Sequence, residues 1–209
     1  MMNPHTVWKL RQKRLEEALE SMAAQTGILI QSIPLDDPAV FRLLCADAPE
    51  TSPKGIPALD SDHARVYLKK IQPQDFGQLT RVIAFCSGSF CSKEDNQKME
   101  RFSGQSLFCT REDVTEYLLN RGLGEADAFA IAEFVRKGLA TRRDKVEWLY
   151  QFDLPEEFYD AVCQIWYLPQ RAAAVSTTAT AYRLYWFKVH HPQVFRSGMR
   201  STGIVTSED

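Results

Sequence analysis

Hydrophobic residues recur along most of this chain at spacings of three and four, the period of an amphipathic α-helix. The pattern is clearest after Leu154, where Phe158, Val162 and Ile165 fall on one helical face and Leu168-Pro169 ends the segment. A second helix is expected from about Arg171, built from small residues at first and from aromatic residues after Tyr182. Pro192 is expected to stop it.

Capping residues and prolines mark the starts of further helices. Asn3 and Gly27 bound one helix, Asp37 and Pro38 open another, and Thr110 with Asp113 forms a capping box that has Asp in place of the usual Glu. Thr141 with Asp144 repeats that signal. The pattern predicts helices over residues 4–25 and 38–46, from 61 to 71 and from 73 to 86 as a helical hairpin, over 110–120 and 125–137, and after 141.

Few segments depart from this helical pattern. Ile28–Ile33 predicts a short strand or an extended segment, and residues 87–105 read as a long loop with one helical turn near 97–102. Residues 47–57, rich in Pro, Ser and Gly, are the best internal boundary. We therefore expect an all-α fold, a compact multi-helix domain of about eight or nine short helices.

The composition is that of a folded protein, because 44% of the 209 residues are hydrophobic and 25% are charged. A net charge of −2 argues against a chain that wraps nucleic acid indiscriminately. Between Ala161 and Ser207, however, there is no Asp or Glu, while five cations remain. This C-terminal quarter is therefore either a local positive surface or a buried aromatic helix with few acids.

Five cysteines occur without an apolar N-terminal segment of the secretory type, so we expect reduced thiols in a cytoplasmic protein. The spacing of Cys86 and Cys91 does not fit a zinc site, and we expect neither a metal nor a cofactor. No apolar run is long enough to cross a bilayer, so no membrane association is expected.

Basic residues gather at one predicted helix junction, where Arg136, Lys137, Arg142 and Arg143 lie close in sequence. They could face phosphate, although cations at a helix C-terminus also complement the helix dipole. On the last long helix, Ser176, Thr180, Arg183 and His190 recur at spacings that place them on one side.

Several stretches resemble, in the same order, the C-terminal fingers region of the PolC-type DNA polymerase III alpha subunit. They are SIPLDDPAVFRLL, GIPALDSDHARVYLKKIQPQDFGQLTRVIAFCSGS, TREDVTEYLLNRGLGEADAFAIAEFVRKG, PEEFYDAVCQIWYLPQRAAAV and YRLYWFKVHHP. The resemblance covers about Ile28 to Arg200. It leaves residues 1–27 as an additional N-terminal amphipathic helix, residues 28–200 as a fingers-like helical domain and residues 201–209 as a flexible tail.

The resemblance implies contacts with DNA or a nucleotide through cationic side chains. We expect these to come from Arg171, Arg183, Lys188, His190, Arg136, Lys137, Arg142 and Arg143. The match is partial, since Arg171 stands where the family has lysine, Ala173 replaces a histidine and Thr177 a tyrosine. A histidine expected within residues 87–95 is also missing.

The resemblance does not imply catalysis, because the palm, PHP, exonuclease and OB parts of the family are not in this sequence. A polymerase needs metal-binding carboxylates. The only D-x-D, Asp60-Ser61-Asp62, falls inside the fingers-like region and is interpreted as a helix cap. We expect no catalytic residue here.

Three functional interpretations remain open. The first is a non-catalytic replication protein that binds single-stranded or primer-template DNA. The second is a protein-interaction module that kept the fold and presents Trp166, Tyr182, Tyr185, Trp186 and Phe187 to a partner. The third is a subunit that completes a polymerase with a separate palm-bearing chain.

Overall fold

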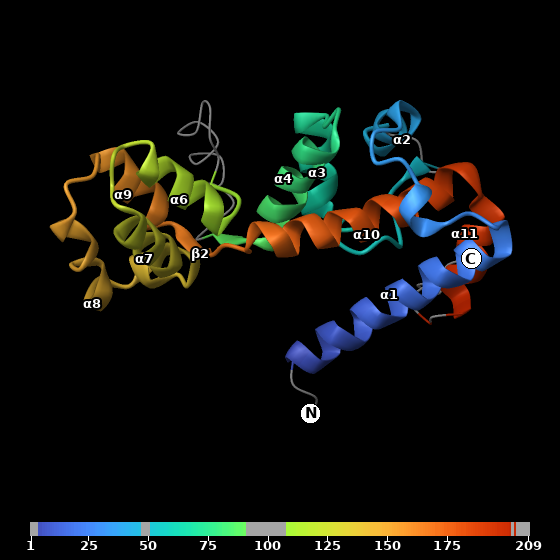
Figure 1. The fold of residues 1–209 in the computed structure, drawn as a ribbon, viewed down its shortest axis with the longest axis horizontal. Coiled ribbons are helices and arrows are strands. Elements are labelled where there is room, and N and C mark those ends of the chain that lie inside the picture. The colour runs from blue at the N-terminus through green and yellow to red at the C-terminus, as the bar shows by residue number, and fades with distance from the viewer. Residues whose placement is uncertain (1–3, 47–50, 91–107, 202, 204–209) are drawn as a thin grey trace. The chain divides into compact units, whose positions relative to one another are not determined.

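The computed structural model describes residues 4–46, 51–90, 108–201 and 203 (Figure 1). The chain divides into two compact units. Unit 1 comprises Met1–Leu79 with Ser176–Asp209, and unit 2 comprises Thr80–Val175. The all-α class is confirmed, since within the described ranges only two short strands, β1 (Ser89–Phe90) and β2 (Ile165–Tyr167), interrupt the helices.

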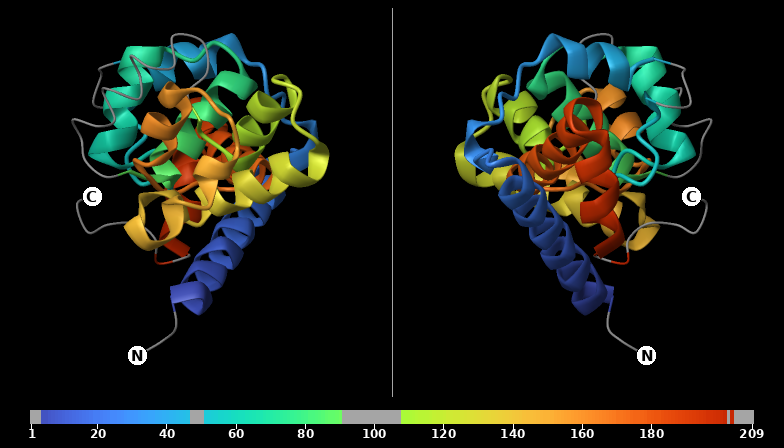
Figure 2. Two further views of the ribbon diagram at one scale, coloured as in Figure 1. Left: turned by 90° about the vertical axis from the view of Figure 1, so that its left-hand side faces the viewer. Right: turned by 90° about the vertical axis from the view of Figure 1, so that its right-hand side faces the viewer.

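Unit 1 is built from helices at both ends of the chain. They are α1 (Pro4–Thr26), the 3-10 turn η1 (Ile30–Ser32), α2 (Pro38–Leu44), α3 (Asp62–Ile71), the first residues of α4 (Phe76–Ser87), most of α10 (Arg171–His190) and α11 (Pro192–Ser201). Helices α1 and α11 pack together and are drawn in blue and red in Figure 2. Gly198 permits this approach, because a Cβ there would lie 2.8 Å from the Met22 side chain.

The N-termini of α2 and α3 follow the capping residues seen in the sequence. The Asp37 carboxylate accepts a hydrogen bond from the Ala39 N–H at 2.9 Å, and the Ser61 hydroxyl accepts one from the Ala64 N–H at 3.0 Å. Asp60-Ser61-Asp62 is therefore a helix start, with Ser61 as N-cap and Asp62 in the first turn of α3.

The aromatic half of α10 forms part of the interior of unit 1. Tyr182, Tyr185 and Phe187 are fully buried. The Tyr182 hydroxyl accepts a hydrogen bond from the Asp37 N–H at 3.0 Å, and the Tyr185 hydroxyl donates one to the Thr51 carbonyl at 2.5 Å. A buried phenol needs such a partner, and each bond fixes a loop against the helix.

Unit 2 holds the remaining elements. They are the later part of α4, β1, α6 (Arg111–Leu119), α7 (Glu125–Arg136), η3 (Leu139–Thr141), α8 (Arg143–Val146), η4 (Leu149–Gln151), α9 (Glu156–Val162), β2 and the first residues of α10. Helices α6 and α7 pack as a hairpin. The capping box at the start of α6 is present, with Thr110 and Asp113 each bonded to the other's backbone N–H.

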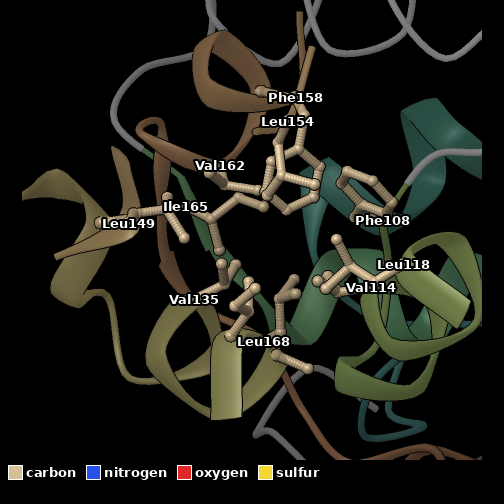
Figure 3. Close-up of a cluster of buried hydrophobic side chains, with 14 of the residues drawn as sticks. Phe108, Val114, Leu118, Val135, Leu149, Leu154, Phe158, Val162, Ile165 and Leu168 are labelled. Carbon is tan, nitrogen blue, oxygen red and sulfur yellow. The ribbon is translucent and has the colours of Figure 1, made fainter. Parts of the chain in front are cut away.

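The core of unit 2 is drawn in Figure 3, where side chains from α6, α7, α9 and β2 converge. Val114 and Leu118 of α6 belong to the same buried cluster as Phe158 and Val162 of α9. The Tyr117 ring stacks on Phe158 with centroids 5.3 Å apart. This apolar packing makes α6 a rigid support for the polar groups on its outer side.

Several local predictions are wrong, including the helix start at residue 73, since α4 begins at Phe76, and the loop at residues 87–105, which contains β1. The helix expected from Leu154 to Leu168 ends at Val162, because Ile165–Tyr167 pairs as β2 with β1. Residues 28–33 form no strand, and Ile30–Ser32 is a 3-10 turn. Thr141 does not cap α8, whose N-cap is Arg142. The Thr141 hydroxyl instead donates a hydrogen bond to the Gly138 carbonyl, which stabilises the 3-10 turn η3.

Among the described residues, no helix is both long enough and apolar enough to span a membrane. Cys45, Cys86 and Cys109 carry free thiols, and burial raises the pKa of Cys86 and of Cys109 to about 12. No group of three or more potential ligands in the described ranges could hold a metal ion. Cys91 and the turn expected near 97–102 lie outside the described residues.

Candidate nucleic-acid interface

Arg171, the first residue of α10, is held by carboxylates of α6 within unit 2. Its guanidinium donates to both oxygens of Glu116, at 2.6 and 2.9 Å, and to Asp113 at 2.9 Å. Its backbone N–H donates to Glu112 at 2.7 Å. The hydrogen bond to Glu116 is the main reason that the pKa of Arg171 is raised, and the same contact lowers the pKa of Glu116. The charge of Arg171 is thus compensated inside the protein.

A polar pocket of about 360 Å³ lies along the same helix. It is lined by Arg81, Asp113, Glu116, Tyr117, Asn120 and Arg121. The Arg121 guanidinium lies 4.4 Å from the centroid of the Tyr117 ring. The walls carry charges of both signs, so the pocket has no pronounced preference for an anion or a cation. Sequence reasoning missed Arg81 and Arg121, which carry no local signal because they are isolated cations on separate elements.

The junction after α7 brings basic residues together around one acid, Glu133. The Glu133 carboxylate accepts hydrogen bonds from Arg136 at 2.8 and 3.0 Å and from Arg111 at 3.0 Å, and lies 3.3 Å from the Lys137 ammonium. The bond from Arg136 is the main cause that lowers the pKa of Glu133 to about 2; burial opposes it, and Arg111 and Lys137 reinforce it. Arg136 is therefore part of a structural network.

The other cations of this junction are more accessible. The side chains of Lys137 and Arg142 are 55% and 57% exposed, and Arg142 makes only a 3.5 Å contact with Asp144. Arg143 is exposed at the start of α8. Since η3 contacts both α7 and α8, the predicted group of Arg136, Lys137, Arg142 and Arg143 lies on connected segments.

Strand β2 lies against this junction. The Leu168 N–H donates to the Arg136 carbonyl at 3.2 Å, and β2 contacts both α7 and η3. Gly138, with φ +68°, makes the contact possible, because a Cβ there would lie 2.9 Å from the carbonyl carbon of Trp166 and closer still to its oxygen. Trp166 and Tyr167 are thereby fixed next to the basic junction.

The remaining predicted residues lie on the unit 1 part of α10. Lys188 donates to the carbonyl oxygens of Ser52 at 2.6 Å and Lys54 at 3.0 Å. His190 Nε2 lies 2.8 Å from the Asp37 carboxylate. Arg183 is half-buried, and its Nε is buried without a hydrogen-bond partner among the described residues. Lys188 and His190 therefore fasten α10 to neighbouring loops.

A family model and individual relatives all indicate similarity to bacterial DNA polymerase III. Residues 12–102 match the family described as the bacterial DNA polymerase III alpha subunit finger domain. This chain resembles the fingers region of PolC-type DNA polymerase III. It is 29% identical over 187 residues, 83% of its length, to the PolC-type DNA polymerase III of Mycoplasma genitalium, and 30% identical over 66% of its length to that of Mycoplasma pneumoniae. The corresponding protein of Lactococcus lactis is 28% identical over 85% of the chain.

The similarity is to a segment of those polymerases. The chain spans 13%, 10% and 12% of the length of the three relatives. The family match begins within α1 and includes α2, α3 and α4. The all-α fold of both units is the one expected for a fingers-like helical region.

Proposed function

We propose that this chain is a non-catalytic, fingers-type protein segment that acts in DNA replication and binds the phosphates of DNA. The observation that carries the proposal is the junction after α7, where Lys137, Arg142 and Arg143 are accessible on connected segments. Exposed ion pairs contribute little free energy, so the contacts to Glu133 and Asp144 leave Lys137 and Arg142 able to bind phosphate. Phosphate contacts of this kind position DNA without reading its sequence.

The other cations have different roles in this proposal. Arg171 is a weak phosphate ligand, because a phosphate would have to displace Glu116 and Asp113 from a compensated guanidinium. Arg183 is half-buried and its Nε is buried, so it is at most a secondary phosphate contact on α10. Lys188 and His190 mainly order unit 1 and would act on DNA only through the position of α10.

The non-catalytic part of the proposal is supported by the place of the only D-x-D sequence. Ser61 caps α3, and the Asp60 carboxylate accepts a hydrogen bond from the Gly55 N–H at 2.9 Å. Asp60 thus fastens the preceding loop, and Asp62 lies in the first turn of α3. In this proposal, catalytic carboxylates are supplied by another part of a polymerase, such as a palm-bearing chain or region.

The test is binding to labelled single-stranded and primer-template DNA across a salt series. We expect affinity to fall steeply with salt, and the triple variant Lys137→Gln, Arg142→Gln, Arg143→Gln to reduce the slope of log K against log[salt] by about two. A control with the same change of charge is Lys70→Gln, Arg196→Gln, Arg200→Gln, at exposed positions of unit 1. An equal loss of affinity in both variants would mean that binding depends on net charge alone, and the junction after α7 would not be the DNA-binding site.

A protein-interaction role is the second candidate. It rests on exposed aromatic surface, but Tyr182, Tyr185 and Phe187 are fully buried and cannot meet a partner. Trp166 is the member of the predicted aromatic set that remains widely exposed. If neither DNA binds at low salt, this role is favoured, and the partner to test is a polymerase or replication protein.

A further inference from the structure

Trp166 and Tyr167 are exposed to an unusual degree for consecutive large aromatic residues. Their exposed fractions are 60% and 42%, while Ile165 before them and Leu168 after them are fully buried. The neighbouring core of unit 2 buries large side chains such as Phe158, so an outward tryptophan gives up the contribution to folding that its burial would make. An exposed aromatic group on a fixed element is a common feature of binding surfaces.

The backbone that carries Trp166 is held on both sides. Strand β2 pairs with β1, where Tyr167 lies opposite Ser89, and its end is bonded to α7 through Leu168 and the Arg136 carbonyl. On the side of η3 the backbone of Trp166 lies against Gly138. Such a ring is presented in a defined place, so little conformational entropy is lost when a flat ligand covers it.

The charges around this ring suit a polyanion. Besides β1, strand β2 contacts α7 and η3, and these two elements lead into the residues Lys137, Arg142 and Arg143. The side chains of Lys137 and Arg142 are more than half exposed. An exposed aromatic face beside accessible cations is the arrangement that single-strand binding surfaces use, with cations on phosphates and rings on bases.

We propose that Trp166 stacks on an unpaired base of single-stranded DNA while Lys137, Arg142 and Arg143 hold the adjacent phosphates. This inference rests on the proposed function and specifies its substrate. The bases of a duplex already stack on one another, so an outward ring gains a base partner only from a single strand or an unpaired end. Successive residues of a strand point to opposite faces, so Trp166 and Tyr167 do not form one continuous platform. Trp166 is assigned the base because it is the more exposed.

The experiment compares three ligands of one length: an oligothymidylate of about 12 nucleotides, its duplex with oligoadenylate, and an abasic oligomer with the same number of phosphates. We expect oligothymidylate to bind about tenfold more tightly than the abasic oligomer. Trp166→Ala should remove this difference without changing affinity for the abasic oligomer, and Trp166→Phe should retain most of it. Tyr150→Ala, at an exposed aromatic residue outside β2, is the control.

Fluorescence gives a second readout that does not depend on the stability of the alanine variant. Oligothymidylate should quench part of the tryptophan emission of the wild-type chain, and the Trp166→Phe variant should bind with that quenching lost. Equal affinity of the wild type for oligothymidylate and the abasic oligomer, or unchanged quenching in Trp166→Phe, would overturn the stacking role. That result would leave DNA binding intact, whereas no binding of any of the three ligands at low salt would overturn the proposed function itself.

Discussion

The Arg171 guanidinium binds the Glu116 carboxylate in a bidentate arrangement, with nitrogen–oxygen distances of 2.6 and 2.9 Å. This pair connects the start of α10 to α6, and Asp113 strengthens it from a more buried position. Two parallel N–H···O bonds fix orientation as well as distance. Arg171, which the sequence suggests as a nucleotide contact, therefore forms an ion pair that connects α10 to α6.

Removal of the Arg171 side chain should destabilise the protein. Arg171→Ala leaves Asp113 and Glu116 without their shared partner, and we expect a loss of about 1–2 kcal/mol, a value limited by solvent screening at this partly exposed pair. Urea denaturation followed by circular dichroism measures it. Arg171→Lys should restore only part of the loss, because an ammonium cannot form the bidentate contact.

The control for this prediction is Arg196→Ala, at an exposed cation of α11, which should change stability by less than about 0.5 kcal/mol. If Arg171→Ala is as stable as that control, the connecting role of Arg171 is wrong. Arg171 would then return to the set of cations available to DNA.

Gly138 and Gly122 form a matched pair for testing the contact between β2 and the α7–η3 turn. Both have positive φ, but a Cβ at Gly122 meets nothing within 4 Å, whereas one at Gly138 runs into the Trp166 backbone. Gly122→Ala should cost about 1 kcal/mol from backbone strain alone. Gly138→Ala should cost about 2–4 kcal/mol, because strand backbone cannot move aside as a side chain can. Equal unfolding free energies for the two variants would contradict the close contact.

The starts of α2, α3 and α6 were predictable because their signals are local. Thr110 and Asp113 satisfy each other's backbone N–H groups within one turn, and Asp37 caps the helix that follows it. The strand at Ile165–Tyr167 was not predictable, since its apolar residues fit a helical period equally well. Its conformation depends on pairing with β1 and on the space that Gly138 leaves, both distant in sequence.

The candidate site was harder to predict than the fold. Arg171 and Glu116 are 55 residues apart in sequence, so no local pattern indicates that they pair. The sequence leaves open whether the aromatic half of α10 is an interface or is buried, and the structure shows that Tyr182 and Tyr185 are buried with their hydroxyls directed to unit 1 loops. A sequence indicates which side chains can bind a ligand; the fold decides which are already engaged.

Glu133 should make the stability of unit 2 depend on acid pH. Its pKa is about 2 in the folded protein and about 4.3 in the unfolded chain, because Arg136, Arg111 and Lys137 stabilise the carboxylate. Its contribution is complete above the unfolded value and is lost as the pH falls from about 4.3 to about 2. After allowance for solvent screening we expect about 1–2 kcal/mol.

The measurement is the free energy of unfolding of the wild type and of Glu133→Gln between pH 7 and pH 3. The variant should be less stable at pH 7, and the difference should shrink as the pH falls. Glu147→Gln, at an exposed acid of the same unit, serves as the control. A constant difference between wild type and Glu133→Gln over this range would show that Glu133 keeps an ordinary pKa.

Asp37 combines two contributions that substitutions can separate. Its carboxylate caps α2 through the Ala39 N–H and pairs with His190 at 2.8 Å. Burial acts to raise the pKa of Asp37, but the hydrogen bonds from His190 and Ala39 outweigh it, so the pKa is lowered. Asp37→Asn keeps a side chain that caps well and loses the negative charge, whereas Asp37→Ala loses both.

We expect Asp37→Asn to lower the free energy of unfolding by about 0.5–1 kcal/mol and Asp37→Ala by about 1–2 kcal/mol. His190→Ala in the wild-type chain should be destabilising, and it should have a much smaller effect in the Asp37→Asn background, since the pair is already broken there. Urea denaturation of the four chains at one pH completes this cycle. If the effects of His190→Ala and Asp37→Asn are additive, the contact does not couple the end of α10 to the start of α2.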